Sequence, residues 1–490
     1  MTTSMPVCSV AVDQIPNLDT RAWRAELLVE LRAGLRLMTM YGRREGAHVT
    51  VTAVVQTPQR TLKILRTVVD ADTGYHELTS ELPALHCFER ELHEQTRLHV
   101  AGHPWLKPLR YEGQGQAEMN GYPFHVVEGK EVHEVAVGPI HAGVIEPGSF
   151  RFSCFGEQVH HLEIQLGYQH RGVERRLLER EPHLLAPLVE TIAGDTSVGH
   201  AWAYCAALES LMGAELELSV DFGRALLLEL ERVAMHLAGL AGLAADVGFL
   251  QGATSYGRLR TTAINTAMRL CGSRFGRGAL RPGGVRLRSS SDTLREARAN
   301  VELLRDDVEL VNDLFASART VQHRLRGVGV VTTATAQELG LVGLVARASG
   351  LRIDARHGAR AGAYQLLPLR PVVETDGDCW SRAVVRIEEM DASLRFIAAV
   401  LDRYADFDEP LQALEPLAPN RLAVAVIEGF RGEVVHCLET GPDGRLRHYK
   451  VQDPSLRNWM GLALAMRGDE ISDFPICNKS FDLSYCGNDL

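Results

Sequence analysis

The chain lacks grouped cysteines. The 490 residues include nine, which are Cys8, Cys87, Cys154, Cys205, Cys271, Cys379, Cys437, Cys477 and Cys486. No two of them have the spacing of a Cys-x-x-Cys pair. An odd number without paired spacing argues against a disulfide framework and is typical of a reducing cytosol. The lack of grouped Cys and His residues also argues against a structural zinc site.

Long apolar runs are absent as well. The nearest approach, residues 237–250, is rich in Gly and Ala and contains Asp246. No stretch reaches the roughly 18 residues that a membrane-spanning helix needs. Residues 1–6 lack the basic and apolar regions of a signal peptide. We therefore expect any membrane association to depend on other subunits.

Positive charge is scarce relative to negative charge. The chain has 52 Lys and Arg against 62 Asp and Glu, a formal net charge of -10, and no long basic run. This balance disfavours nucleic acid as a main partner. The sequence also lacks a Walker A motif, a Gly-x-Gly-x-x-Gly loop after a strand and a Gly-x-Ser-x-Gly nucleophile elbow. It therefore gives no support to nucleotide binding through these loops or to a serine hydrolase activity.

Length and composition are ordinary for a globular protein with a large core. Hydrophobic residues make up 46% and charged residues 23% of the chain, and 490 residues leave room for two to four domains. Residues 1–111 predict a small α+β domain, with helical periodicity over 22–37 and strand alternation beginning at 48–56. Residues 112–134 are polar and contain glycine, which is typical of a linker.

Residues 135–490 have more helical patterns. Apolar residues recur at helical spacing over residues 160–179, 221–245, 294–325 and 382–404. Long helices in this order favour a bundle core with β hairpins at its edges. We therefore predict an α+β fold, in which the small N-terminal domain and the linker precede a helix-bundle-cored domain with peripheral β hairpins.

Three segments together carry a family pattern. Residues 170–174 read His-Arg-Gly-Val-Glu, residues 191–200 read Thr-Ile-Ala-Gly-Asp-Thr-Ser-Val-Gly-His, and residues 481–490 read Phe-Asp-Leu-Ser-Tyr-Cys-Gly-Asn-Asp-Leu. In these segments the chain resembles the large subunit of membrane-bound, group 4 nickel-iron hydrogenases of the formate hydrogenlyase type.

Further segments resemble subunits of respiratory complex I. The stretches similar to its 49-kDa subunit occur in that family's order, at residues 230–237, 347–350, 377–379, 385–390 and 428–433. Two stretches of the first domain, residues 88–91 and 102–111, are similar to formate hydrogenlyase large subunits and the 30-kDa subunit of complex I. The resemblance implies a 30-kDa-like domain over 1–111 and a hydrogenase large-subunit or 49-kDa-like domain over 135–490.

The metal ligands of the hydrogenases are missing. That family binds its metals with a Cys-x-x-Cys pair in each of the second and third segments, where this chain has Ala193, Thr196, Ser484 and Gly487. A nickel-iron centre needs soft thiolate ligands, which these four residues cannot supply. Cys486 alone leaves one thiolate, which does not hold a two-metal cluster. The sequence therefore predicts the frame of a metal pocket with no metal ligands in it.

Glu174 and His170 are the first candidates for catalysis. A residue four positions after another on a helix lies on the same face, so Glu174 would meet His170 or a nearby arginine. The resemblance implies that Glu174 lies beside the pocket and supports metal binding or proton movement. The alternative is a solvated helix face with weak surface ion pairs.

Asp195 and His200 form a second candidate pair, because they are close in sequence within the segment that would otherwise hold thiolates. Buried carboxylates and histidines can titrate near neutrality. The alternative role is structural: Asp195, Thr196 and Ser197 have the composition of a helix N-cap before residues 198–211. The two roles are compatible.

Two histidines are candidates for contacting a cofactor. The resemblance places His141 in the loop where complex I carries a quinone-contacting histidine, although Ile145 stands where that loop has its second one. His183 would replace the tyrosine that complex I offers to a quinone, as a hydrogen-bond donor. The alternative for His141 is a structural loop histidine.

The resemblance places Arg431 beside the vacated pocket. Its guanidinium would bind a carboxylate, a carbonyl or a quinone oxygen there; the alternative is a buried pair with Glu428 or Glu433. Ser484 and Cys486, together with Asp482, would line the pocket from the last ten residues.

The resemblance implies an oxidoreductase subunit of a membrane-associated redox complex. We expect proton-coupled electron transfer next to a small iron-sulfur subunit like the 20-kDa subunit of complex I, with antiporter-like and ferredoxin-like subunits as further partners. The location would be the cytoplasmic face of the membrane, with no cofactor held by this chain and quinone as a candidate acceptor. A scaffold with a vestigial site and an active hydrogenase with unusual ligands are the alternatives.

Overall fold

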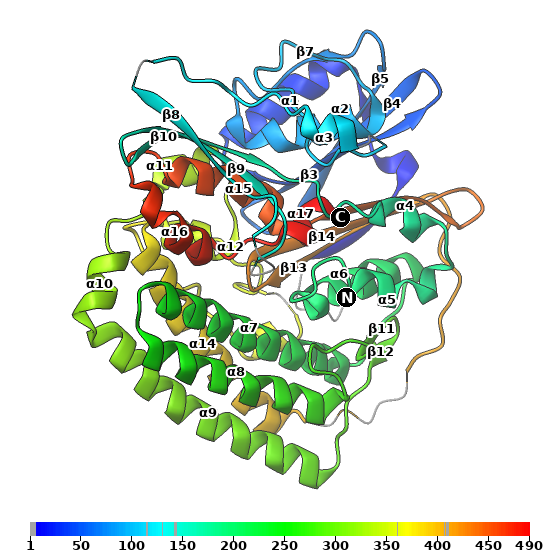
Figure 1. Ribbon diagram of the computed structural model, residues 1–490. Coiled ribbons are helices and arrows are strands. Elements are labelled where there is room, and N and C mark those ends of the chain that lie inside the picture. The colour runs from blue at the N-terminus through cyan, green and yellow to red at the C-terminus, as the bar shows by residue number, and fades with distance from the viewer. Residues whose placement is uncertain are drawn as a thin grey trace.

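A four-stranded antiparallel sheet lies between two other layers of the molecule (Figure 1). The N-terminal helices and strands, drawn in blue, lie above it, and the long helices, drawn in green, lie below it. This computed structural model describes residues 6–113, 116–129, 131–141, 145–359, 361–405, 407 and 411–490. Residues 114, 115 and 130 of the predicted linker lie outside the described part of the chain.

The strands of the central sheet follow the order β1 (Val7–Ala11), β13 (Arg421–Gly429), β14 (Gly432–Thr440) and β15 (Leu446–Gln452). Almost every residue of β13 and β14 is buried, as in a sheet covered on both faces. A tight turn joins these two strands and carries Arg431. Although β1 comes from the first 111 residues, it pairs with β13.

The N-terminal layer contains a second sheet, in the order β2-β5-β4-β3. Its elements are β2 (Asn17–Leu18), α1 (Thr20–Arg32), β3 (Arg36–Glu45), β4 (His48–Gln56), β5 (Leu62–Asp70) and α2 (His86–Thr96). The predicted strand at 48–56 is confirmed. The helix predicted over 22–37 ends at Arg32, because Gly34 has a φ of 93° and turns the chain into β3. This layer has its own apolar core.

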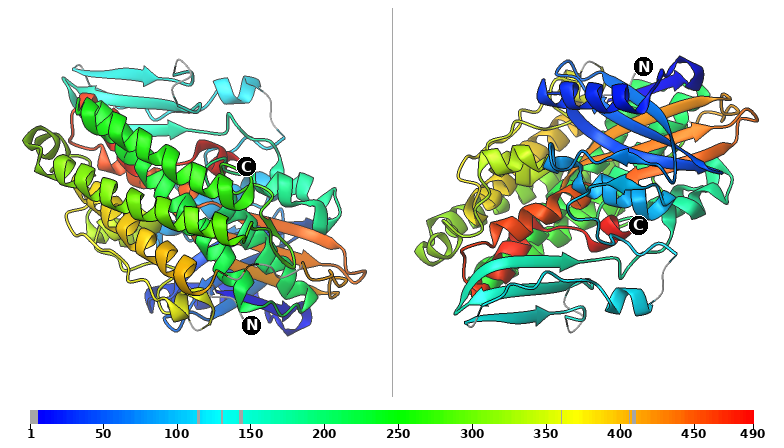
Figure 2. Two further views of the ribbon diagram at one scale, coloured as in Figure 1. Left: turned by 90° about the horizontal axis from the view of Figure 1, so that it is seen from below. Right: turned by 90° about the horizontal axis from the view of Figure 1, so that it is seen from above.

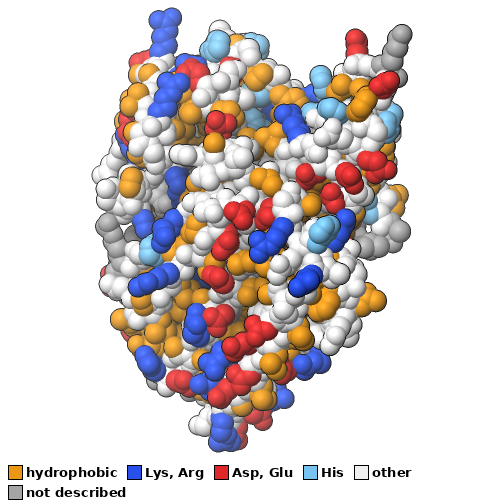
Figure 3. Space-filling view, turned by 90° about the vertical axis from the view of Figure 1, so that its left-hand side faces the viewer, with side chains coloured by type: hydrophobic (Ala, Val, Ile, Leu, Met, Phe, Trp, Pro, Cys, Tyr) orange, Lys and Arg blue, Asp and Glu red, His pale blue; other side chains and the backbone are white. Residues whose placement is uncertain are grey.

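The helix layer is built from five helices that follow one another along the chain or pack together: α7 (Leu218–Asp246), α8 (Leu250–Cys271), α9 (Ser291–Ser317), α10 (Arg319–Leu325) and α14 (Cys379–Arg403). The predictions for 221–245 and 382–404 are confirmed, and the one for 294–325 is divided at Ala318. Figure 2 shows the long green helices side by side. On the face in Figure 3, acidic and basic side chains are interspersed with apolar ones.

A three-stranded meander of β8 (Val132–Val137), β9 (Ser149–Phe155) and β10 (Gln158–Gln165) lies at one edge of the molecule. The helix predicted over 160–179 is therefore wrong for its first part. β10 pairs with β9, and Gly167 and Gly172, with φ of 95° and 63°, stop any continuous helix. Only α4 (Val173–Leu178) remains helical.

The C-terminal segment folds back into the interior. It forms α15 (Pro454–Ala465), α16 (Phe474–Phe481) and α17 (Tyr485–Asp489). The carbonyl of Leu490 accepts hydrogen bonds from the backbone N–H groups of Arg171 (2.8 Å) and Val173 (3.4 Å). The three segments that carry the family pattern are thus brought close together by the fold.

Several further helices and strands are short, apart from the 16-residue helix α6, which packs on β13 and β14. They are β6 (Tyr75–His76), β7 (Val100–Ala101), α3 (Gln116–Asn120), α5 (Ala186–Val189), α6 (Ser197–Met212), α12 (Gly343–Ala348) and α13 (Ala363–Leu366). No helix in the described ranges combines the length and the apolar character that crossing a membrane requires.

Candidate functional site

Arg431 joins two of the predicted pocket segments. From the β13–β14 turn, its Nη1 and Nη2 donate to Oδ1 and Oδ2 of Asp195, both over 2.7 Å. Its Nε donates to the backbone carbonyl of Asp482. A bidentate guanidinium–carboxylate pair is among the strongest and most directional polar contacts in proteins. The turn, the loop before α6 and the C-terminal segment are therefore fastened together at one side chain.

The alternative partners of Arg431 are engaged elsewhere. Glu433 pairs with Arg36 at 2.5 Å, and Glu428 pairs with Arg347 at 2.7 Å. The predicted alternative of a pair between Arg431 and either glutamate is therefore wrong. The prediction that Arg431 lies among the pocket segments agrees with the geometry.

Polar groups stand at or against three of the four positions where the hydrogenases have cysteine. Thr196 Oγ1 accepts from Arg431 Nη1 over 3.3 Å, and Ser484 Oγ accepts the N–H of Gly487 over 2.9 Å, which caps α17. A Cβ added to Gly487 would lie 2.6 Å from Asp453 Oδ2. A carboxylate oxygen therefore takes the space that a side chain at 487 would need. The fourth position, Ala193, is buried and apolar.

This set of groups does not fit a nickel-iron centre. Hydroxyl groups and carboxylates are hard ligands, and a guanidinium cation in their midst opposes a bound metal ion. The remaining thiol, Cys486, lies with its Sγ 3.4 Å from Ser484 Oγ. Burial raises the pKa of that thiol to about 11, with Glu146 adding to the effect, so it stays protonated at neutral pH. Within the described ranges, no three His, Cys, Asp or Glu side chains are grouped to hold a metal.

His200 belongs to a buried row of hydrogen bonds. Its Nε2 lies 3.2 Å from Asp453 Oδ2 and its Nδ1 lies 3.1 Å from His436 Nε2, while His436 Nδ1 lies 2.9 Å from the hydroxyl of Tyr449. All four side chains are buried. Burial and His200 keep the pKa of His436 far below its usual range, so His436 is neutral.

The charge on Asp453 determines which atoms donate in the hydrogen bond with His200. Burial raises the pKa of Asp453, but the contact with His200 more than compensates and the pKa is lowered, so the carboxylate is ionised. An ionised Asp453 accepts the Nε2–H of His200. When His200 is neutral, its Nδ1 accepts from His436 Nε2–H, and His436 Nδ1 accepts from the Tyr449 hydroxyl. In this protonation state every donor in the row points toward Asp453.

Glu231, on α7, has a role that the sequence did not reveal. Its carboxyl oxygens accept the backbone N–H groups of Val198 (2.7 Å) and Gly199 (3.2 Å) at the start of α6. Burial, with a smaller contribution from nearby Asp195, raises the pKa of Glu231 to about 8. The predicted cap at Asp195 is wrong, because Asp195 faces Arg431 and the side chain of the actual N-cap, Thr196, makes no capping bond. A signal for Glu231 existed in residues 230–237, where an acidic–basic couple precedes a histidine.

Neighbouring carboxyl groups therefore differ in protonation. Burial raises the pKa of Asp195, but Arg431 outweighs it and lowers the pKa below its ordinary value. Asp482, 3.6 Å from Arg431 and 3.9 Å from Arg386, has a pKa that burial raises despite both arginines. At neutral pH, Asp195 is ionised and Glu231 carries a proton. Pairs of carboxyl groups with separated pKa values are the usual arrangement of an acid and a base.

Glu174 is held by three contacts within the chain. Its carboxylate accepts the N–H of Val451 (2.9 Å), the Lys450 ammonium (3.0 Å) and the side-chain amide of Gln95 (2.9 Å). Burial raises its pKa, yet Lys450 and Arg110 lower it to about 2. Glu174 is therefore permanently ionised near neutrality and connects α2, α4 and β15.

His170 lies apart from the helix that carries Glu174. Gly172, in the left-handed conformation, precedes the start of α4, so His170 is not on a common helical face with Glu174. Its Nδ1 contacts the carbonyl of Asp489 over 2.8 Å instead. The predicted contact between the two residues is not formed.

The two candidate quinone ligands have different surroundings. His141 Nε2 donates to the carbonyl of Gly148 over 2.9 Å, and a Cβ on Gly148 would touch Tyr485 of α17. The loop of His141 therefore flanks the C-terminal segment. His183 lies exposed in a short 3₁₀ helix. The structure brings His200, Asp195, Arg431 and Ser484 together with Cys486, while His183 lies on the surface.

A cluster of buried charges supports the turn from the helix layer. Arg232 donates to the carbonyls of Glu428 (2.6 Å) and Gly429 (3.0 Å), just before Arg431. The other members are linked by ion pairs or hydrogen bonds and are Glu229, His236, Arg347, Asp354, Arg356 and Glu389. Burial raises the pKa of Glu428 to about 7, with Asp354 adding to the effect. A titratable group thus lies on the strand that leads to the site.

Comparison with known proteins finds hydrogenases and NADH dehydrogenase subunits. The family described as "Respiratory-chain NADH dehydrogenase, 49 Kd subunit" matches residues 246–417. Formate hydrogenlyase subunit 5 of Escherichia coli (strain K12) is 29% identical over 448 residues, covering 87% of this chain and 79% of the relative. The carbon monoxide-induced hydrogenase of Rhodospirillum rubrum is 31% identical over 351 residues, covering 71% of this chain and 97% of the relative.

An NADH-quinone oxidoreductase protein of Bacteroides thetaiotaomicron is also similar, with 30% identity over 358 residues, 72% of this chain and 67% of the relative. Among solved structures, a chain of the membrane-bound sulfane sulfur reductase, an archaeal respiratory membrane complex, superposes with a TM-score of 0.67. That match covers 74% of this chain and 99% of the other at 24% identity, so it speaks for the fold.

Proposed function

The chain belongs to the family that unites large subunits of membrane-bound hydrogenases with 49-kDa subunits of NADH-quinone oxidoreductases, and from this we propose that it serves proton-coupled electron transfer without nickel-iron chemistry. Its relatives are oxidoreductase subunits of membrane-bound complexes. In the proposal, a small iron-sulfur subunit of the 20-kDa type supplies electrons beside the pocket, and a quinone is the candidate acceptor.

The proposed setting is a complex at the inner face of the cell membrane. Antiporter-like subunits would attach the chain to the membrane, and a ferredoxin-like subunit would complete the electron path. The chain itself would hold no metal. These partners come from the family relationship, and they are the parts of the proposal that co-purification tests.

The carboxylate of Asp453 beside Gly487 is the observation that carries the proposal. A metal-binding thiolate at 487 would need the space that Asp453 Oδ2 fills. The same oxygen accepts from His200, so it is part of an ordered polar group and not an accidental neighbour. The pocket frame has been kept while its chemistry has changed from thiolate ligation to proton-handling side chains.

Protonated and ionised groups side by side support a role in proton movement. Glu231, with a pKa of about 8, holds a proton at neutral pH, and Asp195 beside it is ionised. The row from His436 through His200 delivers hydrogen-bond donors to Asp453. An acceptor that gains an electron at this place becomes more basic and takes up a proton from such a donor.

Arg431 and Glu174 have different parts in this proposal. Arg431 holds Asp195 and Asp482 in place and provides positive charge to an acceptor oxygen. Glu174, ionised and contacted on both oxygens, positions β15 against the N-terminal layer and does not exchange protons near neutral pH. The general acids are therefore assigned to His200 and Glu231.

The experiment replaces His200 by Gln in the assembled complex. Turnover with the physiological acceptor, or with a soluble quinone, is expected to fall by about 10²-fold, the range of general acid–base catalysis, and its pH profile is expected to change. His323→Gln, at an exposed position of α10, is the matched control and should retain activity. Unchanged turnover and proton uptake in His200→Gln would remove the row from the mechanism.

A scaffold role is the second candidate, and one observation favours it. Arg431 already satisfies Asp195 through both oxygens, which is also what a disused site filled by structural ion pairs would contain. The two candidates differ in their response to Glu231→Gln. Loss of the titration near pH 8 from the activity profile supports proton movement, whereas an unchanged profile with intact assembly supports the scaffold.

A further inference from the structure

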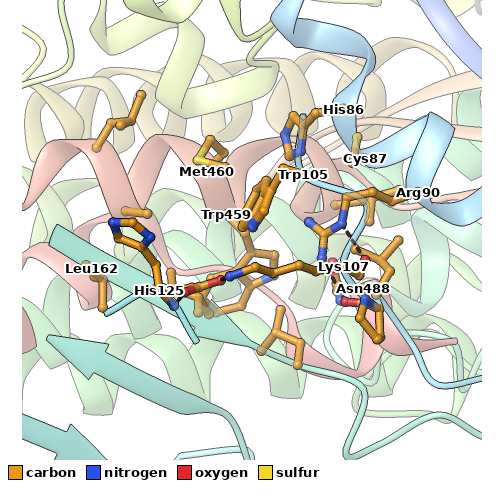
Figure 4. A pocket seen from close by; sticks show the side chains of 18 of the residues that line it. His86, Cys87, Arg90, Trp105, Lys107, His125, Leu162, Trp459, Met460 and Asn488 are labelled. Carbon is orange, nitrogen blue, oxygen red and sulfur yellow. Dashed lines mark hydrogen bonds and ion pairs between the residues drawn. The ribbon is translucent and has the colours of Figure 1, made fainter. Parts of the chain in front are cut away.

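A cavity lined by charged and aromatic side chains lies between the N-terminal layer and the C-terminal helices. It has a volume of about 510 Å³ and is walled by α2, residues 104–109, β10 and α15. Figure 4 shows its side chains converging from these elements, with His86 and Arg90 on one side and His125 on the other. The volume is in the range of sites for drug-sized ligands, which often lie where domains meet. Neither Arg431 nor His200 lines it.

Three ring nitrogens around this cavity are buried without a partner in the described part of the chain. They are His86 Nδ1, His161 Nε2 and Trp459 Nε1. His86 and Trp459 are 8% and 6% exposed. Burial lowers the pKa of His86 to about 3, with Arg90 adding to the effect, and burial also lowers the pKa of His161. Both imidazoles are neutral at pH 7, and the indole can only donate.

Buried polar atoms without partners are rare in folded proteins, so a cluster of three needs an explanation. The explanation that fits here is a ligand with hydrogen-bond acceptors. The Trp459 indole requires an acceptor, and each neutral imidazole has one N–H to offer or one lone pair to fill.

The charges around the cavity favour an anion. Arg90 donates only to the carbonyls of Lys107 (2.8 Å) and Pro108 (2.7 Å), so its charge meets no carboxylate among the described residues. Lys107 is paired with Glu163 at 2.5 Å. Glu163 is also engaged by the Tyr122 hydroxyl and by the N–H of His125. The cavity is therefore positive in a chain whose formal net charge is -10.

The walls favour a flat aromatic body. Trp105 stacks on His86 with ring centroids 5.7 Å apart, and the Arg90 guanidinium lies 4.4 Å above the Trp105 ring. Trp459 and Met460 of α15 also line the cavity. A thioether beside aromatic rings adapts readily to a planar guest. We propose that this cavity binds a small planar aromatic anion, with its ring against Trp105 and Trp459 and its carboxylate or phosphate at Arg90.

The cavity shares a wall with the candidate site. Asn488 of α17 lines it, and Ser484 and Gly487 precede Asn488 on the same C-terminal segment. Trp459 also packs on Tyr485 with ring centroids 4.8 Å apart. A ligand in the cavity would therefore lie against α17, although the proposal does not depend on the function assigned to the site.

The test measures binding of three fluorescent probes to the purified full chain: 2-naphthoate, 2-naphthyl phosphate and the neutral isostere 2-naphthamide. At least one anion is expected to bind about tenfold more tightly than the amide, as a charge-assisted contact to Arg90 predicts. Comparison of the two anions distinguishes a carboxylate from a phosphate ligand. Arg90→Gln should bring the anion to the affinity of the amide.

Two further variants keep the test decisive if Arg90→Gln folds poorly. Trp459→Phe retains a ring but removes the N–H and should weaken the anion several-fold. Arg467→Gln, at the exposed rim of the cavity, should weaken the anion less. Arg175→Gln, on exposed α4, is the control that should bind as the wild type does.

Three results would overturn the proposal. The first is equal binding of naphthoate, naphthyl phosphate and naphthamide. The second is binding that Arg90→Gln and Trp459→Phe, both correctly folded, leave unchanged. The third is loss of probe binding when the chain is assembled with its partner subunits, which would show that a partner covers the cavity.

Discussion

The Arg431 site and the Trp105 cavity bury polar groups in opposite ways. At the site, Arg431, Asp195, His200 and Asp453 all have partners within the chain. Around the cavity, one ring nitrogen in each of three residues has no partner among the described residues, and Arg90 donates only to carbonyls. One region is complete without a ligand, whereas the other lacks acceptors.

This difference shows which of the two regions holds its polar groups by itself and which leaves them available to a ligand. A pocket that has lost its thiolates would leave buried polar atoms exposed to an empty space unless other groups replaced them. In this chain Arg431 pairs with Asp195 and binds the carbonyl of Asp482, so these segments are fastened together without a metal ligand. Unpartnered groups are found elsewhere, and that is where an external ligand has something to contribute.

The largest expected effect on stability comes from breaking the ion pair between Arg431 and Asp195. Arg431→Met leaves Asp195 without its partner and is expected to lower the free energy of unfolding by about 2–4 kcal/mol, somewhat less than for a fully enclosed pair because Asp195 retains contact with solvent. Chemical denaturation measures the change. Arg175→Met, whose partner Glu179 is exposed, should cost less than about 0.5 kcal/mol. Equal losses in the two variants would contradict the account.

The second prediction concerns Glu174 and pH. Its folded pKa of about 2 lies below the ordinary value of 4.5, so its stabilising contribution is present above about pH 4.5 and is lost as the pH falls toward 2. The contribution is on the order of 2–3 kcal/mol. Glu174→Gln should therefore be less stable than wild type at pH 7 and nearly equal to it near pH 2. A constant difference across this range would show that Glu174 is not ionised in the folded chain.

The third prediction restores a side chain at one ligand position. Gly487→Ala would place its Cβ 2.6 Å from Asp453 Oδ2, and overpacking of this kind costs about 1–3 kcal/mol. Gly257→Ala, in the middle of α8 with open space around it, should instead stabilise the chain by about 0.5–1 kcal/mol. Thermal unfolding of both variants gives the comparison. A neutral or stabilising Gly487→Ala would show that the position is still open.

The smallest effect on stability is expected at the cavity beside Trp105, where His86 has a ring nitrogen without a partner among the described residues. His86→Phe keeps the ring that stacks on Trp105 and removes the nitrogen that has no partner. Replacing an unsatisfied buried polar group by an apolar one of similar shape is neutral or stabilising, by up to about 1 kcal/mol here. Denaturation should confirm this. A loss comparable to that of Arg431→Met would mean that His86 has a structural partner.

The sequence predicted elements whose signal is local. Residues 221–245 and 382–404 are helices as expected, because long apolar periodicity specifies a helix whatever it packs against. Residues 160–165 form a strand instead, since pairing with β9 overrides a short ambiguous pattern. The neighbourhood of Arg431 followed from the family pattern, which places three distant segments together.

The partners within the site could not be predicted from spacing. Asp453 reaches His200 across more than 250 residues of chain, and Glu231 caps α6 from a different helix. Glu174 was found because residues 170–174 match the family pattern. Its contacts with Lys450 and Gln95 could not be predicted, because they depend on how β15 packs near α2. Side chains that meet through packing of separate layers leave no periodicity in the sequence, so only the fold reveals them.

Metal analysis of the intact complex tests the central claim most directly. The complex would be purified without oxygen, and its nickel and iron contents would be measured per copy of this chain. The account predicts nickel at background level, with iron matching the iron-sulfur subunits alone, because Asp453 Oδ2 fills the space beside position 487 and the Arg431 cation contacts Thr196. Stoichiometric nickel that is lost in an Asp195→Asn or Asp453→Asn variant would contradict it.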